Sequence, residues 1–363
     1  MTTMTSEMVS RSNTRPLALY DGPQAWYGSD MAARAAEWTH QWTAAEIAEI
    51  EAAVDDVERR GLDILEIGAD AFPLPTVAER LAQIKRQVLH GPGFFLLRDR
   101  PIETWTNRRA AVAFWGMGMH MGQPCSQNGK GHVLGHVKNL GLDYSDPLAR
   151  GYQTNARLAY HTDSSDIVGL LCYKPGKSGG LSSIVSSTTV YNEMVKRRPD
   201  LVAVMMRPFQ RTRWGEIPEG KQSWAELPVF MPHQGRMIVH YVRSAIRKGQ
   251  LIEGVTPLSD EQVEALDFFD SLAEDPEIHL DMEFRPGDIQ LLCNHSIMHS
   301  RTAFEDYEAP EKRRHLLRLW LACDDGPPLP SWMTDAYEGK TSRGRPNGIQ
   351  VPGVAFKAPL EAE

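Results

Sequence analysis

The chain has 363 residues, of which 42% are hydrophobic and 24% are charged, and its formal net charge of −8 comes from interspersed acidic and basic residues. Such a composition is typical of a globular protein, and it lacks the basic footprint that a nucleic-acid partner requires. With no apolar stretch near the roughly 20 residues that cross a bilayer and no secretory signal at the N-terminus, we expect a cytoplasmic protein outside the membrane.

The N-terminal third predicts an irregular extension over residues 1–45 and then helices. Thr43-Ala-Ala-Glu46 has the pattern of a capping box, and apolar residues follow it at helical spacing up to Gly61. Thr76-Val-Ala-Glu79 repeats the pattern, and a third helix is expected over Asn107–Met119. Gly93–Leu97 is a short apolar run between charge and glycine, which predicts a buried strand.

From about residue 130 the pattern is that of strands, interrupted by one helix near Thr189 and another after the capping box Ser259-Asp-Glu-Gln262. Short strands with Gly/Pro turns favour a fold that is mainly β with flanking helices, built on a double-stranded β-helix (jelly-roll) core. We expect one domain over residues 46–330, a lid-like insert around 205–275, and a C-terminal tail over 331–363. The expected strands are His132–Val137, Ile167–Tyr173, Leu181–Ser186, Val229–Met231, Met237–Tyr241, His279–Phe284, Ile289–Cys293 and Arg314–Ala322.

The four cysteines form no C-x-x-C pair, which argues against a zinc ribbon or a redox dithiol. Cys172, Cys293 and Cys323 lie in or beside apolar runs. We interpret them as buried small hydrophobic residues.

Tyr160-His-Thr-Asp163 is the first motif that could carry chemistry. On an extended segment His161 and Asp163 project to the same side, because side chains alternate with a period of two. One imidazole and one carboxylate supply two of the three ligands of the facial triad of non-haem iron(II) oxygenases. The motif alone is weak, since an H-x-D sequence is more often a structural His beside an Asp.

A second histidine ligand would come from Asn294-His-Ser-Ile-Met-His-Ser-Arg301. His295 and His299 both lie near the end of the expected strand Ile289–Cys293. Sequence spacing does not separate these two candidates.

Two arginines stand on the otherwise mostly apolar strand Arg314–Ala322. Arg314 and Arg318 share one face by the period of two, whereas Arg313 points to the other face. Buried guanidinium groups need anionic partners, and an arginine fork suits a carboxylate. A dicarboxylic co-substrate and a pair of structural salt bridges are both consistent with this pattern.

Taken together, these motifs resemble the taurine dioxygenase and 2,4-dichlorophenoxyacetate dioxygenase superfamily, which includes clavaminate-synthase-like enzymes. The resemblance covers roughly residues 90–325, and its motifs occur in the family's order. They are Gly91–Leu97, His161-Thr-Asp163, Gly179–Ser182 leading to Tyr191, Pro286-Gly-Asp288 with His299–Phe304, and Arg313–Arg318.

The resemblance implies an Fe(2+) ion held by His161, Asp163 and His299, and so it selects His299 over His295. It implies that Arg314 binds the distal carboxylate of 2-oxoglutarate with help from Ser182. The implied reaction uses O2, releases succinate and CO2, and oxidises, in the simplest case hydroxylates, a substrate C–H bond. The retained carboxylate of Asp163 argues against a halogenase, where a small residue takes its place.

The resemblance gives less information about the residues that would contact the substrate. Arg318 would face a small, acidic substrate, and Asn128 could line the entrance. Because the interval from Asp163 to Ser182 is shorter than in taurine dioxygenase, Ser183, Ser186 and Thr188 remain alternatives to Ser182. The interval from His299 to Arg314 is longer than usual, so a loop near 305–311 must bulge out. Homo-oligomer formation is left open.

Two other function classes compete with an oxygenase. A metal-dependent hydrolase or isomerase could use the same ion as a Lewis acid, but would not need the arginine pair. A non-catalytic metal-binding protein would be expected to have lost a ligand, and none is missing.

Overall fold

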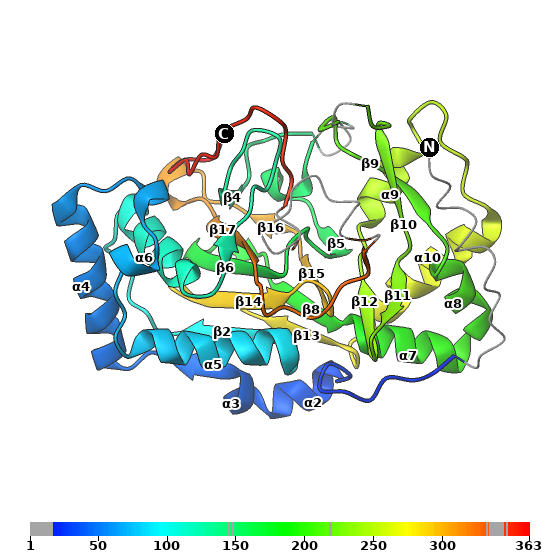
Figure 1. Cartoon of the computed structure of the whole chain (residues 1–363), viewed down its shortest axis with the longest axis horizontal. Coiled ribbons are helices and arrows are strands. Elements are labelled where there is room, and N and C mark those ends of the chain that lie inside the picture. The colour runs from blue at the N-terminus through cyan, green and yellow to red at the C-terminus, as the bar shows by residue number, and fades with distance from the viewer. Residues whose placement is uncertain are drawn as a thin grey trace.

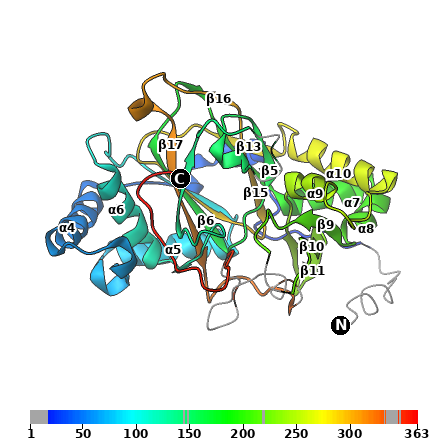
Figure 2. The ribbon, with the colours of Figure 1, turned by 90° about the horizontal axis from the view of Figure 1, so that it is seen from above.

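The computed structural model describes residues 17–143, 146, 149–217, 220–331, 333, 345 and 348–363. Two β-sheets form its centre, with helices outside them (Figure 1 and Figure 2). The larger sheet has seven strands: β1 (Thr39–Gln41), β2 (Phe94–Arg98), β14 (Ile289–Cys293), β6 (Ile167–Lys174), β17 (His315–Ala322) and β3 (Gln123–Pro124) in this order, with β4 (Leu134–Lys138) beside β17. The smaller sheet is β13 (His279–Met282), β8 (Ser182–Ser186), β15 (Ile297–Arg301) and β5 (Leu158–His161).

Three smaller β-elements complete the described strands. The hairpin β9 (Phe209–Thr212) with β10 (Trp224–Leu227) and the hairpin β11 (Phe230–His233) with β12 (Arg236–Val239) both fall within the expected insert. The short pair β7 (Ser178–Gly179) with β16 (Phe304–Glu305) lies near the beginning of the loop before β17.

Helices cover both ends of this β-centre. On the left of Figure 1 lie α4 (Ala44–Arg60) and α6 (Asn107–Met119), with α5 (Val77–His90) and the short α2 (Gly28–Ala33) and α3 (Ala35–Trp38) below. On the right lie α7 (Ser187–Arg197), α8 (Pro199–Met205), α9 (Arg243–Gly249) and α10 (Asp260–Ala273). Single 3-10 turns occur at Ile64–Glu66, Ala69–Ala71, Gly151–Gln153 and Pro310–Lys312.

The capping signals at α4 and α10 act as predicted. The Thr43 hydroxyl accepts a hydrogen bond from the Glu46 backbone N–H, and Glu46 accepts one in return from the Thr43 backbone. Ser259 and Gln262 make the same reciprocal pair at α10. Helix α6 also has its predicted bounds. These boundaries depend on contacts within one turn, which the local sequence fixes.

The second predicted capping box is wrong. At α5 the Thr76 side chain caps nothing, and the backbone N–H groups of Thr76 and Val77 donate to the carboxylate of Glu49 on α4, at 2.9 and 2.8 Å. Glu49 on α4 therefore takes the place of the local capping residues, because its carboxylate reaches the unpaired backbone N–H groups at the start of α5.

The expected irregular extension over residues 1–45 is also wrong within its described part. Helices α2 and α3 and strand β1 occupy residues 28–41, and Trp26, Met31 and Trp38 are buried against the larger sheet. Residues 1–16 lie outside the described part of the chain.

Three apolar clusters hold these layers together. One lies between the larger sheet and helices α4, α5 and α6, and includes Phe114, Leu291 and Leu319. A second joins α7, α8, α10 and the outward face of the smaller sheet, where Val185 and Met298 point. The third fills the space between the two sheets with residues such as Leu170, Ile184 and Trp320. Alternate residues of one strand therefore enter different clusters, as the period of two requires.

The C-terminal segment 348–363 runs along the outside of the strands as a strap, drawn in red in Figure 2. The Ile349 backbone N–H donates to the Ser126 carbonyl and that of Lys357 to the Gly131 carbonyl, both at 2.8 Å. At Gly348 φ is +68°, and an added Cβ would lie 2.1 Å from the Ser126 oxygen, so only glycine fits this approach.

All four cysteines are buried and unpaired with one another, which confirms for Cys172, Cys293 and Cys323 the interpretation as buried small residues. Burial raises the pKa of Cys172 to about 12. Among the described residues, no helix combines the length and the apolar character needed to cross a membrane.

Candidate metal centre

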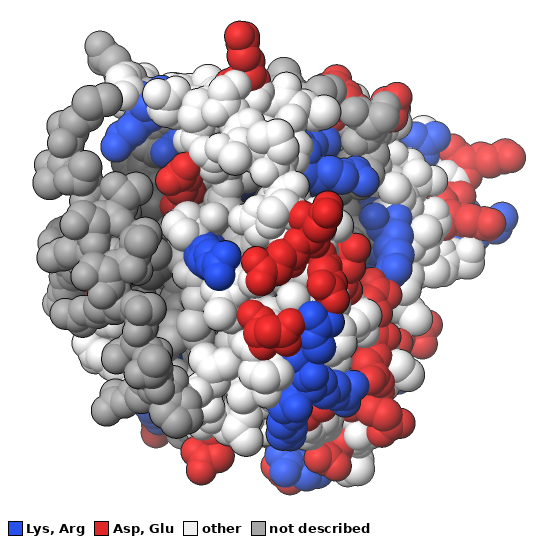
Figure 3. Space-filling view, turned by 90° about the vertical axis from the view of Figure 1, so that its right-hand side faces the viewer, with Lys and Arg blue, Asp and Glu red and all other residues white. Residues whose placement is uncertain are grey.

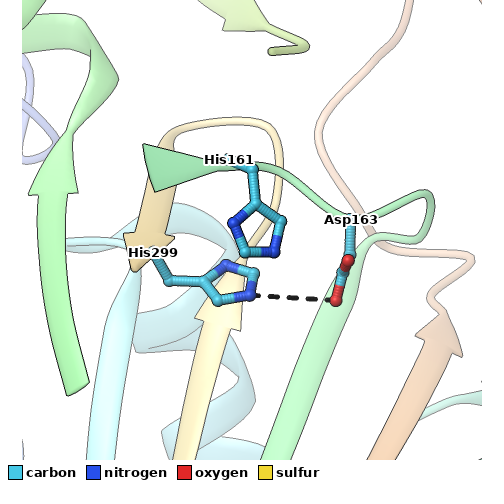
Figure 4. A group of neighbouring side chains, drawn as sticks. All are labelled: His161, Asp163 and His299. Atoms are coloured by element: carbon cyan, nitrogen blue, oxygen red, sulfur yellow. Dashed lines mark ion pairs between the residues drawn. The ribbon is translucent and has the colours of Figure 1, made fainter. Parts of the chain in front are cut away.

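His161, Asp163 and His299 come together where β5 ends beside β15 (Figure 4). Their nearest donor atoms all lie within 4.8 Å of one another, and His299 Nε2 is 3.9 Å from Asp163 Oδ2. A metal ion with bonds of roughly 2 Å needs donors about 3 to 4 Å apart, so small side-chain rotations are enough to close around one. Within the described residues, no other group of His, Cys, Asp and Glu side chains meets this spacing.

The register of the smaller sheet creates this meeting. His299 on β15 is paired directly with His161 on β5, and their ring centroids are 4.2 Å apart. Asp163 follows two residues later, where the chain leaves the strand, and its backbone N–H is fixed by the Asn294 side chain at 3.1 Å. The H-x-D spacing therefore places both of its members beside the distant histidine.

Hydrogen bonding presents one nitrogen of His161 to the centre. Its Nδ1 donates to the Ala159 carbonyl at 2.9 Å, which leaves Nε2 as the nitrogen that could bind a metal ion. Metal-binding histidines are held in this manner, since the outer hydrogen bond fixes both the tautomer and the ring orientation. The donor set therefore fits a divalent ion.

The charge states of the other two side chains also suit ligation. Burial and the neighbouring His161 lower the pKa of His299 to about 3, so its ring is neutral. Burial alone would raise the pKa of Asp163, but Arg318 and the two histidines outweigh burial and lower it. The centre therefore offers a neutral imidazole at His299 and a carboxylate at Asp163, beside the ring of His161.

His295, the competing candidate, has a different partner. Its Nε2 lies 2.7 Å from Asp166 Oδ1, and both residues are buried. Asp166 also accepts hydrogen bonds from Arg345 and from the Cys323 backbone. His295 is thus part of a buried structural network.

A cavity of about 260 Å³ opens onto the three side chains. Arg314, Ser182, Arg301 and Leu316 are among the residues that line it. Arg318, Tyr152, Trp320 and Val137 also line it, together with Gly348 and Ile349 of the strap. The residues of the expected insert that line it are Arg211–Trp214, Glu216, Ala225, Leu227, His240 and Val242–Ala245.

Arg314 has an unused hydrogen-bonding edge. It is buried, its Nη2 donates weakly to the Gly180 carbonyl at 3.4 Å, and its Nη1 has no hydrogen-bond partner among the described residues. Burial lowers the pKa of Arg314 to about 10, so the group remains a cation at neutral pH. A buried cation with a free donor is costly unless an anion joins it.

Ser182 also lines the cavity. It donates to Gln290 Oε1 at 3.1 Å. The three alternatives lie elsewhere: Ser183 bonds the Tyr160 hydroxyl, Ser186 caps α7, and Thr188 faces a separate cavity near Tyr20.

The two residues expected on the substrate side differ in position. Arg318 lines the cavity, but its Nη1 is 3.3 Å from Asp163 Oδ2 and its Nε donates to Gln127 at 2.7 Å. Asn128 does not line the cavity, and its side chain bonds Lys130 and His132 within its own turn. Asn128 therefore does not line the cavity as expected. Its neighbour Gln127 instead accepts the hydrogen bond from Arg318, which lies beside Asp163.

Sequence reasoning missed a residue that contacts one of the candidate metal ligands. Trp320 donates to Asp163 Oδ2 at 2.8 Å. The signal for Trp320 was present, since it shares the face of Arg314 and Arg318 by the period of two.

Comparisons with known proteins give a consistent result. The model of a family described as "Taurine catabolism dioxygenase TauD, TfdA family" matches residues 58–320. FR-33289 synthase of Streptomyces rubellomurinus is 30% identical over 319 residues, which cover 86% of this chain and 93% of that protein. The taurine hydroxylase-like protein SAT17 of Stachybotrys chartarum is 29% identical over 291 residues, covering 76% and 72%.

Solved structures resemble the fold. An asparagine oxygenase in complex with Fe(II), 2S,3S-3-hydroxyasparagine and succinate superposes with a TM-score of 0.64 at 14% identity, covering 86% of this chain and 98% of that one. The non-haem iron oxygenase OrfP in complex with Fe, succinate and (3S)-hydroxy-L-Arg gives a TM-score of 0.59 at 13% identity, covering 85% and 99%.

Proposed function

Because this chain belongs to the TauD, TfdA family of dioxygenases, we propose that it oxidises a small anionic substrate at an iron ion held by His161, Asp163 and His299. The reaction class is that of an iron(II)- and 2-oxoglutarate-dependent dioxygenase, and a hydrolase or isomerase is not favoured. The observation that carries the site assignment is the convergence of the three donors within 4.8 Å at the wall of a cavity that also contains Arg314.

Iron(II), when bound, would activate O2 together with 2-oxoglutarate, and the protein supplies binding, orientation and protection from water. His161 and His299 would bind as neutral imidazoles, and Asp163 as a carboxylate. The hydrogen bond from His161 Nδ1 to Ala159 would hold the ring so that Nε2 is the nitrogen that binds the ion.

Arg314 and Ser182 would bind the distal carboxylate of 2-oxoglutarate. The unused Nη1 of Arg314 supports this role, since a carboxylate would supply the anion that the buried guanidinium lacks. The Ser182 hydroxyl would reorient from Gln290 toward the same group. Phe304 packs against the Arg314 guanidinium at 5.1 Å and would hold its plane.

An anionic substrate is supported by the charge of the remaining cavity wall. Arg150, Arg211, Arg213, Arg243 and Arg318 line it, whereas Glu216 is the one acidic side chain among the described lining residues besides Asp163. Glu216 is occupied by Arg150, at 2.5 Å, and by the Gly129 backbone. A net positive wall selects a carboxylate, sulfonate or phosphate group over a neutral or cationic one.

We further propose that the two facing sheets form a jelly-roll core over residues 46–330 and that the 205–275 insert acts as a lid. The hairpin β9–β10 lines the cavity, and Glu216 in the segment between its strands forms an ion pair with Arg150, which supports this role. On the face of the molecule seen in Figure 3, acidic and basic side chains of the described residues are intermixed.

The proposal is tested by adding iron(II) and 2-oxoglutarate to the protein without oxygen and recording the visible charge-transfer band of the complex. We expect a band, and oxygen should then release succinate faster when a suitable anion from a panel of small carboxylates, sulfonates and phosphates is present. A protein that binds iron(II) without the band would contradict the 2-oxoglutarate site. Stimulation by neutral compounds alone would contradict the substrate class.

A further inference from the structure

The carboxylate of Asp163 is held by two side chains of β17 before any metal is considered. The Trp320 indole N–H donates to Oδ2 at 2.8 Å, and Arg318 Nη1 lies 3.3 Å from the same oxygen. Trp320 and Arg318 are two residues apart on one strand, so both face Asp163 across the space between the sheets. All three side chains are buried.

Two aromatic rings and a hydrogen bond hold the Arg318 side chain in place. Its guanidinium lies between the rings of Tyr152 and Trp320, at 4.7 and 4.9 Å from their centroids. Its Nε donates to Gln127 Oε1, and Gln127 Nε2 donates to the Arg318 and Val133 carbonyls. Those two bonds set the orientation of the amide, which therefore accepts from Arg318.

The backbone makes room for this arrangement at one position. Gly135 on β4 is the register partner of Arg318, and an added Cβ there would lie 2.1 Å from Gln127 Oε1. A larger residue would push Gln127 away from Arg318. Gly135, Gln127 and Arg318 thus form one chain of contacts that ends at Asp163.

We infer that Trp320 is a positioning residue for the metal centre, and that Arg318 acts with it by holding Asp163 as well as by lining the substrate wall. This inference rests on the proposed function in taking Asp163 as the metal ligand. A carboxylate with one oxygen bound by two donors cannot rotate freely, so it presents a fixed direction to the ion. Such outer partners commonly change metal affinity by roughly 10- to 100-fold when they are removed.

The indole is the better group to test, because it carries no charge. Removal of Arg318 would also remove a cation that repels a metal ion, and the two effects would oppose each other. The indole N–H is a donor only, so Trp320→Phe deletes the hydrogen bond and keeps an aromatic ring.

The chain offers a matched control. Trp115 on α6 is equally buried, and its indole N–H donates to the Ile67 carbonyl at 2.9 Å, in the cluster outside the larger sheet. Trp115→Phe also deletes one buried indole hydrogen bond. Both variants should lose stability in urea, but only Trp320→Phe changes a contact of the triad.

The experiment titrates each protein with Mn(II) and follows the free ion by electron paramagnetic resonance. We expect Trp320→Phe to weaken Mn(II) binding by about 10-fold or more and Trp115→Phe to leave it within about two-fold. The charge-transfer band formed with iron(II) and 2-oxoglutarate should shift in Trp320→Phe and not in Trp115→Phe.

A second variant separates the hydrogen bond from packing. Trp320→Gln loses the ring but retains an N–H donor that reaches about as far, so it should bind Mn(II) more tightly than Trp320→Phe. Equal affinity of Trp320→Phe and Trp115→Phe, or tighter binding by Trp320→Phe than by Trp320→Gln, would overturn the inference. A wild-type protein that binds no Mn(II) would overturn the metal site itself and this inference with it.

Discussion

His299 on β15 lies directly opposite His161 on β5, with the two ring centroids 4.2 Å apart. Side chains of directly paired residues on neighbouring strands are the closest contacts that a sheet offers. This single register pair joins segments separated by more than a third of the chain, and the position of Asp163 follows from it.

The first prediction concerns the choice between the two histidines. His299→Ala should abolish the charge-transfer band with iron(II) and 2-oxoglutarate, because it removes a donor at the centre. His295→Ala should retain the band, because His295 bonds Asp166 and faces away from the cavity. Anaerobic absorption spectra of both variants are the measurement. A band that survives in His299→Ala and disappears in His295→Ala would reverse the assignment.

The second prediction concerns Arg314. Arg314→Gln should raise the KM for 2-oxoglutarate by roughly 10- to 100-fold, because a charge-assisted hydrogen bond to a carboxylate contributes about 1.5 to 3 kcal/mol. Ser182→Ala should raise it less, by roughly five-fold, since a neutral hydroxyl contributes about 1 kcal/mol.

Arg313→Gln is the control for Arg314→Gln. Its side chain reaches the Glu308 carbonyl, outside the cavity. Succinate formation at varied 2-oxoglutarate concentration gives all three values. If Arg313→Gln raised the KM as much as Arg314→Gln, the proposed clamp would be wrong.

The third prediction concerns the buried ion pair between Arg345 and Asp166. Arg345 Nε donates to Asp166 Oδ2 at 3.0 Å, and Asp166 is completely buried. Arg345→Ala should lower the free energy of unfolding by about 3 kcal/mol, because it leaves a buried charge with fewer partners. Urea denaturation measures this loss.

Arg198→Ala is the matched control for Arg345→Ala, since Arg198 forms ion pairs with Asp200 and Glu264 at the protein surface. It should leave the urea midpoint nearly unchanged, because exposed pairs are screened by water. Equal losses in the two variants would show that burial of the Asp166 pair does not matter.

The fourth prediction concerns pH. His136 Nδ1 and His315 Nε2 are 2.7 Å apart, and burial with the neighbouring His136 lowers the pKa of His315 to about 3. The folded protein therefore keeps His315 neutral, whereas the unfolded chain takes up a proton below pH of roughly 6.5. The contribution of this histidine to the free energy of unfolding should thus be constant above that pH and decrease below it, by about 1.4 kcal/mol at pH 5.5.

Urea unfolding at pH 7.5 and 5.5 checks this sign. His315→Gln cannot take up the proton, so its loss of stability between the two pH values should be smaller than that of the wild type by about the same amount. An unchanged difference in His315→Gln would contradict the assignment of the effect to this residue.

The fifth prediction concerns the C-terminal strap. Gly348→Ala should release the strap from Ser126, because its Cβ would lie 2.1 Å from the Ser126 oxygen. Hydrogen exchange should then accelerate at the Ile349 amide, which donates to that oxygen. Gly353→Ala is the control, since Gly353 also has a positive φ of 81° but no atom within 4 Å of an added Cβ. Slow exchange at Ile349 in Gly348→Ala would contradict this account.

Local sequence determined the helices and strands that depend only on interactions within a few residues of the chain. The capping boxes at Thr43 and Ser259 set the starts of α4 and α10, and apolar runs predicted β2, β6, β14 and β17 within about one residue. The period of two placed Arg314 and Arg318 on one face of β17, and the cavity confirms this. These predictions are confirmed because they depend only on short-range geometry.

Tertiary structure decided what distant segments contribute. Glu49 caps α5 in place of the local box. Gln127 and not Asn128 bonds Arg318, and strand β15, which the sequence did not predict, orients His299. Local spacing left His295 and His299 equivalent, and the family resemblance preferred His299 without explaining the preference. The physical reason is the pairing of β15 with β5, which turns one histidine toward the cavity and leaves the other beside Asp166.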